Sequence, residues 1–160
     1  MHRRELVLGG VLAGVGFSPA RAEEPTAKAL PQRFAAALTA GDMTAFADLF
    51  AEDYLNHQIS AAAPAPSGKS MKKATVDFFA NRVNALAGLQ VGVEASLAEG
   101  ELCAASFVYE GVHQSVYYGY APTGRKLRFT SCDIFRVVNG KIAEHWGMGD
   151  IAGVVAQLKG

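Results

Sequence analysis

The chain has 160 residues, half of them apolar, and its fifteen acidic and fifteen basic side chains leave a net charge near zero. This length and composition predict one globular domain with a hydrophobic core. The balanced charge and the lack of a clustered basic run argue against a surface that binds nucleic acid.

Residues 1–22 have the parts of an export signal. A charged start, His2-Arg3-Arg4, precedes the apolar run Leu6–Phe17, and Ala20-Arg21-Ala22 forms a small-x-small cleavage site. This run is too short to cross a hydrocarbon core of ~30 Å as a helix, so we expect no stable membrane anchor. The paired arginines suggest a twin-arginine signal, and an ordinary secretory signal is the open alternative. Either signal predicts that the mature domain, residues 23–160, is periplasmic or secreted.

The first half of the mature chain has apolar residues at helical spacing in three segments. Gly41 fits the left-handed position that ends the first helix, and Asp42 can cap the second. A loop rich in Ala, Pro, Ser and Gly at residues 61–68 precedes the third helix. The three apolar stripes are Leu30, Phe34 and Leu38; Met43, Phe46, Leu49 and Phe50; and Met71, Phe78, Phe79, Val83 and Leu86.

The second half alternates apolar and polar residues, which is typical of half-buried strands. Strands are predicted at 89–97, 102–113 and 127–146, the last of them interrupted by the hairpin signal Asn139-Gly140. A short helix at 151–158 closes the chain. Helices followed by strands predict an α+β domain, in which a curved antiparallel sheet packs against three N-terminal helices and forms a cone that encloses an apolar pocket.

The loop length of this hairpin decides which side chains meet. A two-residue turn pairs Asp133 with Trp146, whereas a three-residue loop with Gly140 left-handed pairs Asp133 with His145. We favour the second register, because it concentrates the titratable groups in one apolar setting. It gathers these side chains on a single face: Phe129, Ser131, Asp133, Phe135, His145 and Gly147.

Export would permit a disulfide between the two cysteines, Cys103 and Cys132. Strand alternation places them on opposite faces of the sheet, where the sulfur atoms point apart and cannot bond. We therefore expect two buried free thiols. The face that carries Cys132 also carries Arg136 and Glu144, which we expect to lie diagonally across the hairpin.

Asp133 and His145 are the candidate catalytic residues. An apolar cavity raises the pKa of a carboxylate toward the range in which it removes a proton next to a carbonyl, and His145 would orient it or shuttle the proton. The alternative is a buried pair that only fixes the hairpin. The sequence has no Gly-rich phosphate loop and no G-x-S-x-G elbow, and neither cysteine has a histidine partner, which disfavours nucleophilic hydrolysis.

Six motifs follow one another along the mature chain: Tyr54-Leu55-Asn56-His57, Gly111-Val112-His113, Gly119–Arg125, Asp133–Arg136, Asn139–Trp146 and Asp150. Together they resemble the SnoaL-like polyketide cyclase (ester cyclase) family of the nuclear-transport-factor-two-like superfamily. The resemblance covers nearly all of residues 23–160. It implies a cone-shaped α+β barrel, homodimers formed through the sheet, and ring closure by aldol condensation without a metal or organic cofactor.

The implied fold brings His57 and His113 near the mouth of the cone, where they are candidates to bind a carbonyl or carboxylate group of a ligand. Satisfied polar residues at strand and loop ends are the alternative. Asp150 is a candidate ligand contact or, alternatively, the N-cap of the last helix. Asn56 and Phe129 complete the candidate ligand-binding set. The histidines show no H-x-x-x-H spacing, so we expect no metal site.

The chain departs from this family at two positions. The cyclases carry their catalytic acid two residues after the position of His145, where this sequence has Gly147, and they carry a histidine at the position of Asp133. Asp133 with His145 is therefore our hypothesis for a relocated pair, and the resemblance supports the fold more firmly than the reaction.

Our leading interpretation is an exported, cofactor-free small-molecule enzyme of the SnoaL-like type. It would perform acid–base chemistry, a lyase- or isomerase-like proton transfer or a ring closure, on an apolar carbonyl compound. Gly147 favours the alternative, a non-catalytic protein that binds a small apolar ligand in the same cone. A metal-dependent site built from three histidines is the third interpretation.

Overall fold

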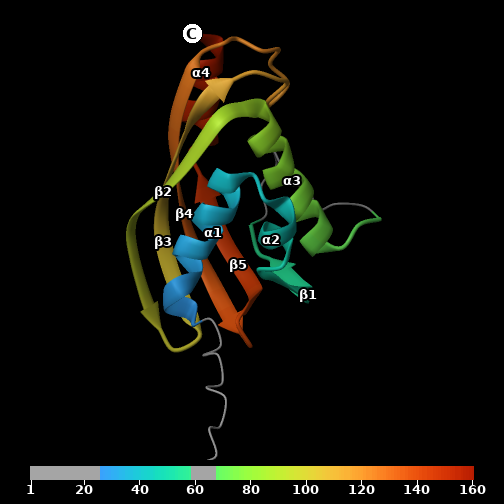
Figure 1. Ribbon diagram of the computed structural model, residues 1–160, viewed down its shortest axis with the longest axis vertical. Helices are drawn as coiled ribbons and strands as arrows, with labels where there is room; N and C mark the ends of the chain where they lie inside the picture. The colour runs from blue at the N-terminus through green and yellow to red at the C-terminus, as the bar shows by residue number, and fades with distance from the viewer. Residues whose placement is uncertain (1–25, 59–67) are drawn as a thin grey trace, which may run out of the picture.

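The computed structural model describes residues 26–58 and 68–160. The predicted signal at residues 1–22 and all but the last residue of the predicted loop 61–68 lie outside these ranges. The described residues form one curved sheet with helices packed on one of its faces (Figure 1). The predicted α+β fold class is confirmed.

The sheet has five strands in the order β1-β5-β4-β3-β2. Strands β2 to β5 pair antiparallel, but β1 pairs parallel with β5, so the sheet is mixed rather than wholly antiparallel. It is open, with β1 and β2 at its edges. The strand bounds are β1 Phe50–Asn56, β2 Leu86–Glu99, β3 Leu102–His113, β4 Lys126–Val138 and β5 Lys141–Gly149.

Three helices precede most of the sheet and cover its inner face, and a fourth follows it (Figure 1). As predicted, Gly41 ends α1 with φ 66°, and the Asp42 side chain caps α2 by accepting from the Ala45 amide at 2.9 Å. The prediction that α2 extends to Phe50 is wrong. The Leu49 carbonyl accepts from the Ile142 amide instead, so pairing with β5 replaces the helix. The helices are α1 Leu30–Ala40, α2 Met43–Ala47, α3 Met71–Ala85 and α4 Ile151–Lys159, with a 3-10 turn at Ala27–Ala29.

An aromatic cluster joins the helices to the sheet. The ring of Phe34 on α1 lies 5.0 to 5.5 Å from the rings of Phe46 on α2, Phe79 on α3, Phe107 on β3 and Phe135 on β4. All five rings are buried. Since burying such a side chain contributes about 1.5–3 kcal/mol, this cluster is a main reason why the two layers stay together.

The β4–β5 hairpin turns at the predicted position. Val138 pairs with Lys141, and the two residues between them, Asn139 and Gly140, have φ values of 50° and 71°. Positive φ at both central positions defines a type I′ turn, which fits the right-handed twist of the strands.

The pairing register then shifts within the hairpin. A β-bulge leaves Ala143 as an extra residue in β5, so Asp133 lies opposite Gly147. Neither predicted partner of Asp133 is therefore right, because Trp146 and His145 are both displaced. The shift from the favoured register is two residues, so every side chain keeps its predicted face. Asp133 and His145 lie diagonally on the inner face.

The two cysteines are free, as predicted, and lie on opposite faces. Cys103 is buried on the inner face, where burial raises the pKa of its thiol to about 11. The prediction that Cys132 is buried is wrong, because no described helix covers the outer face at this point and the side chain is exposed.

The outer face of the sheet combines ion pairs with exposed apolar side chains. Arg136 Nε lies 2.6 Å from Glu144 Oε1, directly opposite rather than diagonal as predicted, because of the bulge. Large apolar residues on this face remain exposed: Ile134, Trp146 and Met148.

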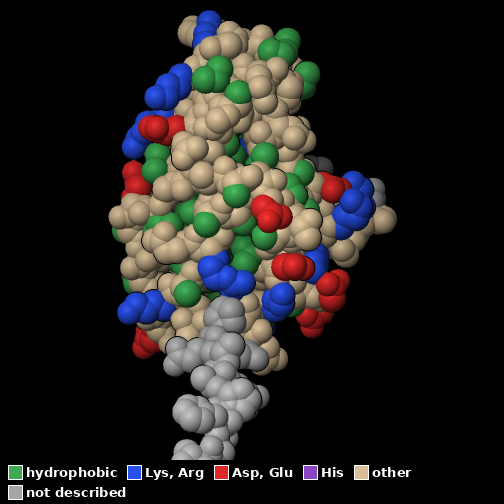
Figure 2. Space-filling model, viewed as in Figure 1, with side chains coloured by type: hydrophobic (Ala, Val, Ile, Leu, Met, Phe, Trp, Pro, Cys, Tyr) green, Lys and Arg blue, Asp and Glu red, His purple; other side chains and the backbone are tan. Residues whose placement is uncertain are grey.

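Acidic and basic side chains are interspersed over the face that carries α1 and α2 (Figure 2). Within residues 26–58 and 68–160, no helix is both long and apolar enough to span a membrane.

Candidate functional site

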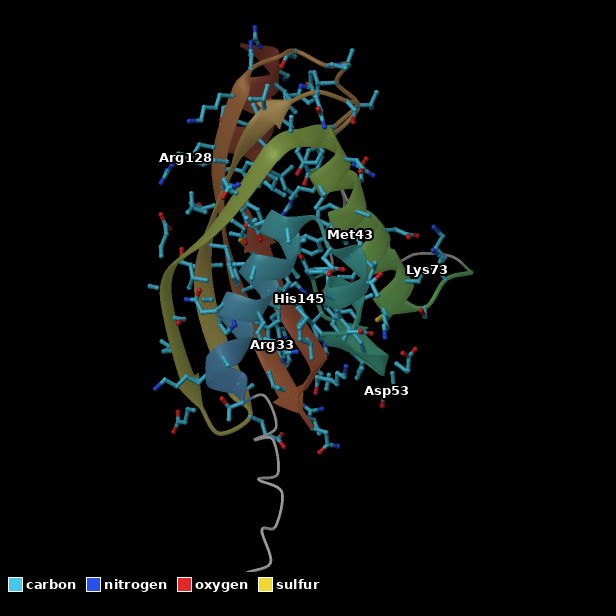
Figure 3. All side chains as sticks on the ribbon, viewed as in Figure 1. Arg33, Met43, Asp53, Lys73, Arg128 and His145 are labelled. Atoms are coloured by element: carbon cyan, nitrogen blue, oxygen red, sulfur yellow. The ribbon has the colours of Figure 1, made fainter. Side chains whose placement is uncertain are left out.

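Asp133 on β4 and His145 on β5 form a buried pair on the inner face. Asp133 Oδ1 lies 2.8 Å from His145 Nε2, and the two residues are 5% and 3% exposed. His145 lies behind α1, on the side of the sheet that the helices cover, whereas Lys73 and Asp53 point outward (Figure 3). The predicted catalytic pair is thus brought together.

The second oxygen of Asp133 is also hydrogen-bonded. The Ser131 hydroxyl donates to Asp133 Oδ2 at 2.6 Å, and it lies 3.4 Å from the Tyr109 hydroxyl. Burial raises the pKa of Tyr109 to about 12, so this phenol stays protonated at neutral pH. Each oxygen of Asp133 therefore has one hydrogen-bond partner, Ser131 on one side and His145 on the other.

Tyr54 on β1 completes the chain of contacts on the other side of His145. Its hydroxyl lies 3.1 Å from His145 Nδ1 and 3.5 Å from the Thr75 hydroxyl on α3. Burial raises the pKa of Tyr54 well above its usual range, which keeps the phenol protonated. When Tyr54 donates to Nδ1, the proton of the neutral imidazole resides on Nε2, where it faces Asp133.

Gly147 is required by this pair. A Cβ atom at position 147 would lie 2.6 Å from His145 Nε2 and closer still to Asp133 Oδ1, far inside van der Waals contact. The Asp133 carboxylate thus occupies the space that a side chain at position 147 would need. A side chain at position 147 is therefore incompatible with the observed placement of Asp133 and His145.

The predicted ligand residues at the end of β1 diverge. Asn56 Nδ2 lies 3.5 Å from Thr75 Oγ1, which joins Asn56 to the buried chain. His57 instead stacks on Trp146 at 4.5 Å and lies 2.7 Å from Glu144 on the outer face. The structure does not bring His57 together with the catalytic pair.

The other predicted ligand residues also lie in different places. Phe129 is on the inner face and stacks on Tyr109, with the ring centroids 5.1 Å apart. His113 is fully buried; its Nδ1 accepts from the Thr123 amide at 3.2 Å, and its Nε2 has no partner among the described residues. The Asp150 side chain caps α4 by accepting from the Gly153 amide at 2.8 Å, which confirms the predicted N-cap.

Sequence reasoning gave no role to several residues of the buried chain. Ser131 had a usable signal, because it precedes Asp133 by two positions and so shares its face. Tyr54 stands in one of the resembling motifs, but its contact with His145 spans 91 positions of the chain. The sequence around Thr75 and Tyr109 predicts only that these residues lie among apolar neighbours. Nothing in the sequence predicts that Arg82 on α3 is buried.

Ser131 also lines an open hollow near the end of β5, most of whose lining residues lie on the outer face of the sheet. The hollow is lined by Ser106, Thr130, Ser131, Cys132, Met148, Gly149 and Asp150.

In the part of the chain that the structure describes, no cluster of three or more His, Cys, Asp or Glu side chains is arranged to hold a metal ion.

A carboxylate in this setting can act as a base. Each carboxylate oxygen has two lone pairs, so Asp133 can accept a proton while it keeps its bonds to Ser131 and His145. Burial strengthens hydrogen bonds and disfavours an uncompensated charge, so the surrounding hydroxyl groups decide where a proton rests. The arrangement is thus chemically suited to proton transfer.

Comparison with known proteins finds one family model that matches most of the chain. The family model described as SnoaL-like polyketide cyclase matches residues 28–158. No curated protein matches the chain.

Three solved structures have the same fold. TsrD from Streptomyces laurentii is 21% identical, with a TM-score of 0.70, and the match covers 82% of this chain and 92% of that one. AclR from Streptomyces galilaeus, a candidate hydroxylase, is 23% identical, with a TM-score of 0.71 over 82% and 94% of the two chains. IdmH from Streptomyces antibioticus, a candidate polyketide cyclase, is 26% identical, with a TM-score of 0.68 over 81% and 95%.

Proposed function

We propose, from the premise that this chain belongs to the SnoaL-like polyketide cyclase family, that it is an enzyme that transfers protons on an apolar carbonyl compound without a cofactor. The observation that carries this proposal is the buried Asp133–His145 pair, held at 2.8 Å between the Tyr54 and Ser131 hydroxyl groups. A pair that served only the hairpin would not need a hydroxyl partner from β1, a strand outside the hairpin.

In the proposed reaction, Asp133 removes a proton from the carbon next to the substrate carbonyl. The electron pair of the C–H bond moves to the carbonyl oxygen and forms an enolate, which a buried phenol such as Tyr109 holds by donating a hydrogen bond. The enolate carbon then takes the proton back from Asp133, or it attacks a second carbonyl of the same molecule and closes a ring. In the second case the alkoxide formed on that carbonyl takes the proton from Asp133, which restores the base. His145 orients Asp133 and exchanges its proton.

The test is hydrogen–deuterium exchange on a simple apolar ketone. With 2-tetralone in deuterated buffer, the wild type should speed exchange next to the carbonyl, and Asp133→Asn should lose about 100-fold or more of that rate. Glu144→Gln, which alters the acid of the outer face, is the matched control and should keep the rate. Equal rates for wild type and Asp133→Asn, with melting temperatures preserved, would refute the proposal.

The same experiment addresses the second candidate function, a binding protein, which the missing acid at Gly147 favours. Binding of 2-tetralone by calorimetry without any enzymatic exchange would support that function. Binding with exchange would support the enzyme.

We further propose that the protein is exported by the segment 1–22 and forms a homodimer through the outer face of the sheet. The sequence pattern of the segment supports export. The exposed Ile134, Trp146 and Met148 support a contact surface, because monomeric proteins rarely leave such residues side by side. Sedimentation of residues 23–160 should show a dimer that Met148→Glu dissociates, and a monomeric wild type would contradict this.

A further inference from the structure

Arg82 on α3 is a buried cation that the proposed mechanism does not use. The residue is 6% exposed, and its Nε donates to the Tyr117 hydroxyl at 3.0 Å. The guanidinium carbon lies 4.5 to 5.2 Å from four ring centroids, those of Phe78, Phe79, Tyr109 and Phe129.

Among the described residues, no carboxylate lies within 4 Å of the Arg82 guanidinium. The arginines of the outer sheet face, the exposed Arg128 and the half-buried Arg136, both have such partners. Burial alone favours the neutral form of Arg82, but the surrounding tyrosine oxygens raise its pKa, so the side chain remains charged. A buried ion without a counter-ion is costly, and the aromatic faces offset only part of that cost.

The guanidinium has five N–H donors, and Tyr117 is the one acceptor that the described residues provide. Aromatic faces interact with the charge but are not hydrogen-bond acceptors of the carboxylate kind. Among the described residues, the side chain therefore keeps charged N–H donors without an acceptor. The natural complement of such donors is a carboxylate, which binds a guanidinium through two parallel hydrogen bonds.

Arg82 and the catalytic pair are linked through Tyr109. The ring of Tyr109 lies 4.5 Å from the Arg82 guanidinium carbon, and its hydroxyl lies 3.4 Å from the Ser131 hydroxyl that donates to Asp133. An anionic group bound at Arg82 would thus be separated from the Asp133 carboxyl group by Tyr109 and Ser131. Phe78, whose ring centroid lies 5.0 Å from the guanidinium carbon, is 42% exposed, so this aromatic neighbour of Arg82 reaches the surface.

His113 provides a second unpartnered donor near this place. Its Nδ1 accepts from the Thr123 amide, so the proton resides on Nε2, which is buried without a partner among the described residues. The His113 ring lies 6.5 Å from the ring of Tyr117, the residue that binds Arg82. Two donors that lack acceptors therefore flank one tyrosine.

We propose that Arg82 binds a carboxylate of the substrate, so that the substrate is an aromatic or otherwise apolar carbonyl compound that carries a carboxylate group. This rests on the proposed function, because it specifies which carbonyl compounds reach Asp133. The rings around Arg82 hold the apolar body, and the charge of Arg82 sets the orientation of the molecule relative to Asp133.

The test compares two probes of equal shape and different charge. Calorimetric titration at neutral pH should show that 2-naphthoate binds the wild type about 10-fold or more tightly than 2-naphthamide does. Arg82→Met keeps the apolar packing and should remove this preference by weakening naphthoate alone. Arg128→Met, which removes an exposed arginine of the outer face, is the matched control and should leave both affinities unchanged.

Asp133→Asn separates this proposal from the proposed function. It should abolish exchange on 2-tetralone but keep or strengthen naphthoate binding, because it removes a negative charge near the site. Loss of exchange with no preference for naphthoate in any variant would overturn the role of Arg82 and leave the catalytic pair intact. A preference for naphthoate without exchange in the wild type would support the role of Arg82 and overturn the catalytic role of Asp133 and His145.

Two further outcomes would overturn the proposal. If Arg82→Met slows exchange but leaves naphthoate binding unchanged, Arg82 holds the enolate oxygen formed in the reaction rather than a substrate carboxylate. If Arg82→Met does not fold, Arg82→Lys replaces it. The lysine keeps the charge but not the planar guanidinium, so its preference for naphthoate should fall, and an unchanged preference would be contrary to the proposal.

Discussion

Two pairs of a histidine and an acid lie on opposite faces of β5, and the N···O distance within each pair is nearly the same. The inner pair, Asp133 and His145, is separated by 2.8 Å, and the outer pair, Glu144 and His57, by 2.7 Å. The side chains of the inner pair are 7% and 4% exposed, whereas those of the outer pair are 20% and 38% exposed. Distance alone does not distinguish them.

Their surroundings do. Glu144 also binds Arg136 at 2.6 Å, and the hydrogen bonds from His57 and Arg136 lower its pKa, so it remains an ionised surface acid. Asp133 has hydroxyl and imidazole partners but no basic side chain within 4 Å other than His145 among the described residues. An exposed pair contributes little to stability, whereas a buried one depends strongly on every partner. The environment, not the pairing, makes the inner carboxylate a candidate base.

The largest effect should come from truncating a side chain of the inner face. Phe135→Ala removes a fully buried ring that packs on Phe34 and stacks on His145, and it should lower the free energy of unfolding by about 3–5 kcal/mol. Its neighbour Ile134 points to the outer face, and Ile134→Ala should cost less than about 1 kcal/mol. Urea denaturation of both variants measures this. Equal costs would show that the side chains of the inner face do not pack more tightly than those of the outer face.

The next effect tests the space shared by Gly147 and the inner pair. Gly147→Ala should cost about 2–4 kcal/mol, because the methyl group displaces Asp133 and His145 and breaks their hydrogen bond. In an Asp133→Ala background, the same substitution should cost at least about 1 kcal/mol less, since the colliding carboxylate is gone. A double-mutant cycle in urea measures the coupling. Additive costs would mean that Gly147 does not serve the pair.

Cysteine reactivity offers a comparison of the faces without a stability measurement. Cys132 is exposed, whereas Cys103 is buried with its thiol pKa raised to about 11. A thiol reagent at neutral pH should therefore label one cysteine of the native protein and both after unfolding. Cys132→Ser should abolish native labelling. Rapid native labelling of Cys103 would contradict the buried inner face.

The smallest effect concerns the outer pair in acid. Because the folded-state pKa of Glu144 is lowered, its bonds contribute stability above the ordinary carboxyl pKa, and this contribution is lost as pH falls through the lower folded value. Urea midpoints measured from about pH 5 to about pH 3 should therefore decline slightly less for Glu144→Gln than for the wild type. The shift should be small, because the pair is exposed and screened. A large shift would mean that the outer pair contributes as much to stability as the inner pair, contrary to this expectation.

Strand alternation predicted the face of each residue only together with the favoured three-residue loop, because a two-residue turn would have sent His145 to the face opposite Asp133. In the structure Asp133, His145 and Gly147 share the inner face, and Arg136 and Glu144 the outer one. Helix caps were equally local, so Gly41 and Asp42 could be assigned from the sequence. The family resemblance, carried by short motifs, matches the family found by comparison.

The features that could not be predicted depend on contacts between distant segments. The bulge at Ala143 accompanies the pairing of β1 with β5, and neither is encoded in the turn residues that fix the hairpin. Tyr54 meets His145 only because β1 lies beside β5 in parallel. Arg82 looks like an ordinary polar residue of a helix until the sheet places two aromatic rings against it. Tertiary placement, rather than local propensity, builds the candidate site.

The open edge at β2 affects the tendency of this protein to aggregate at high concentration. A long, regular unpaired strand is a template on which further chains polymerise. The pairing of β2 with β3 is interrupted twice, between Ala87 and Gln90 and between Val93 and Ala95, and Gly88 has a φ of 62°. The free N–H and C=O groups of β2 therefore do not form one continuous row, and the strand carries charge at Glu94 and Glu99. These irregularities should make fibre growth from this edge slow even at high concentration.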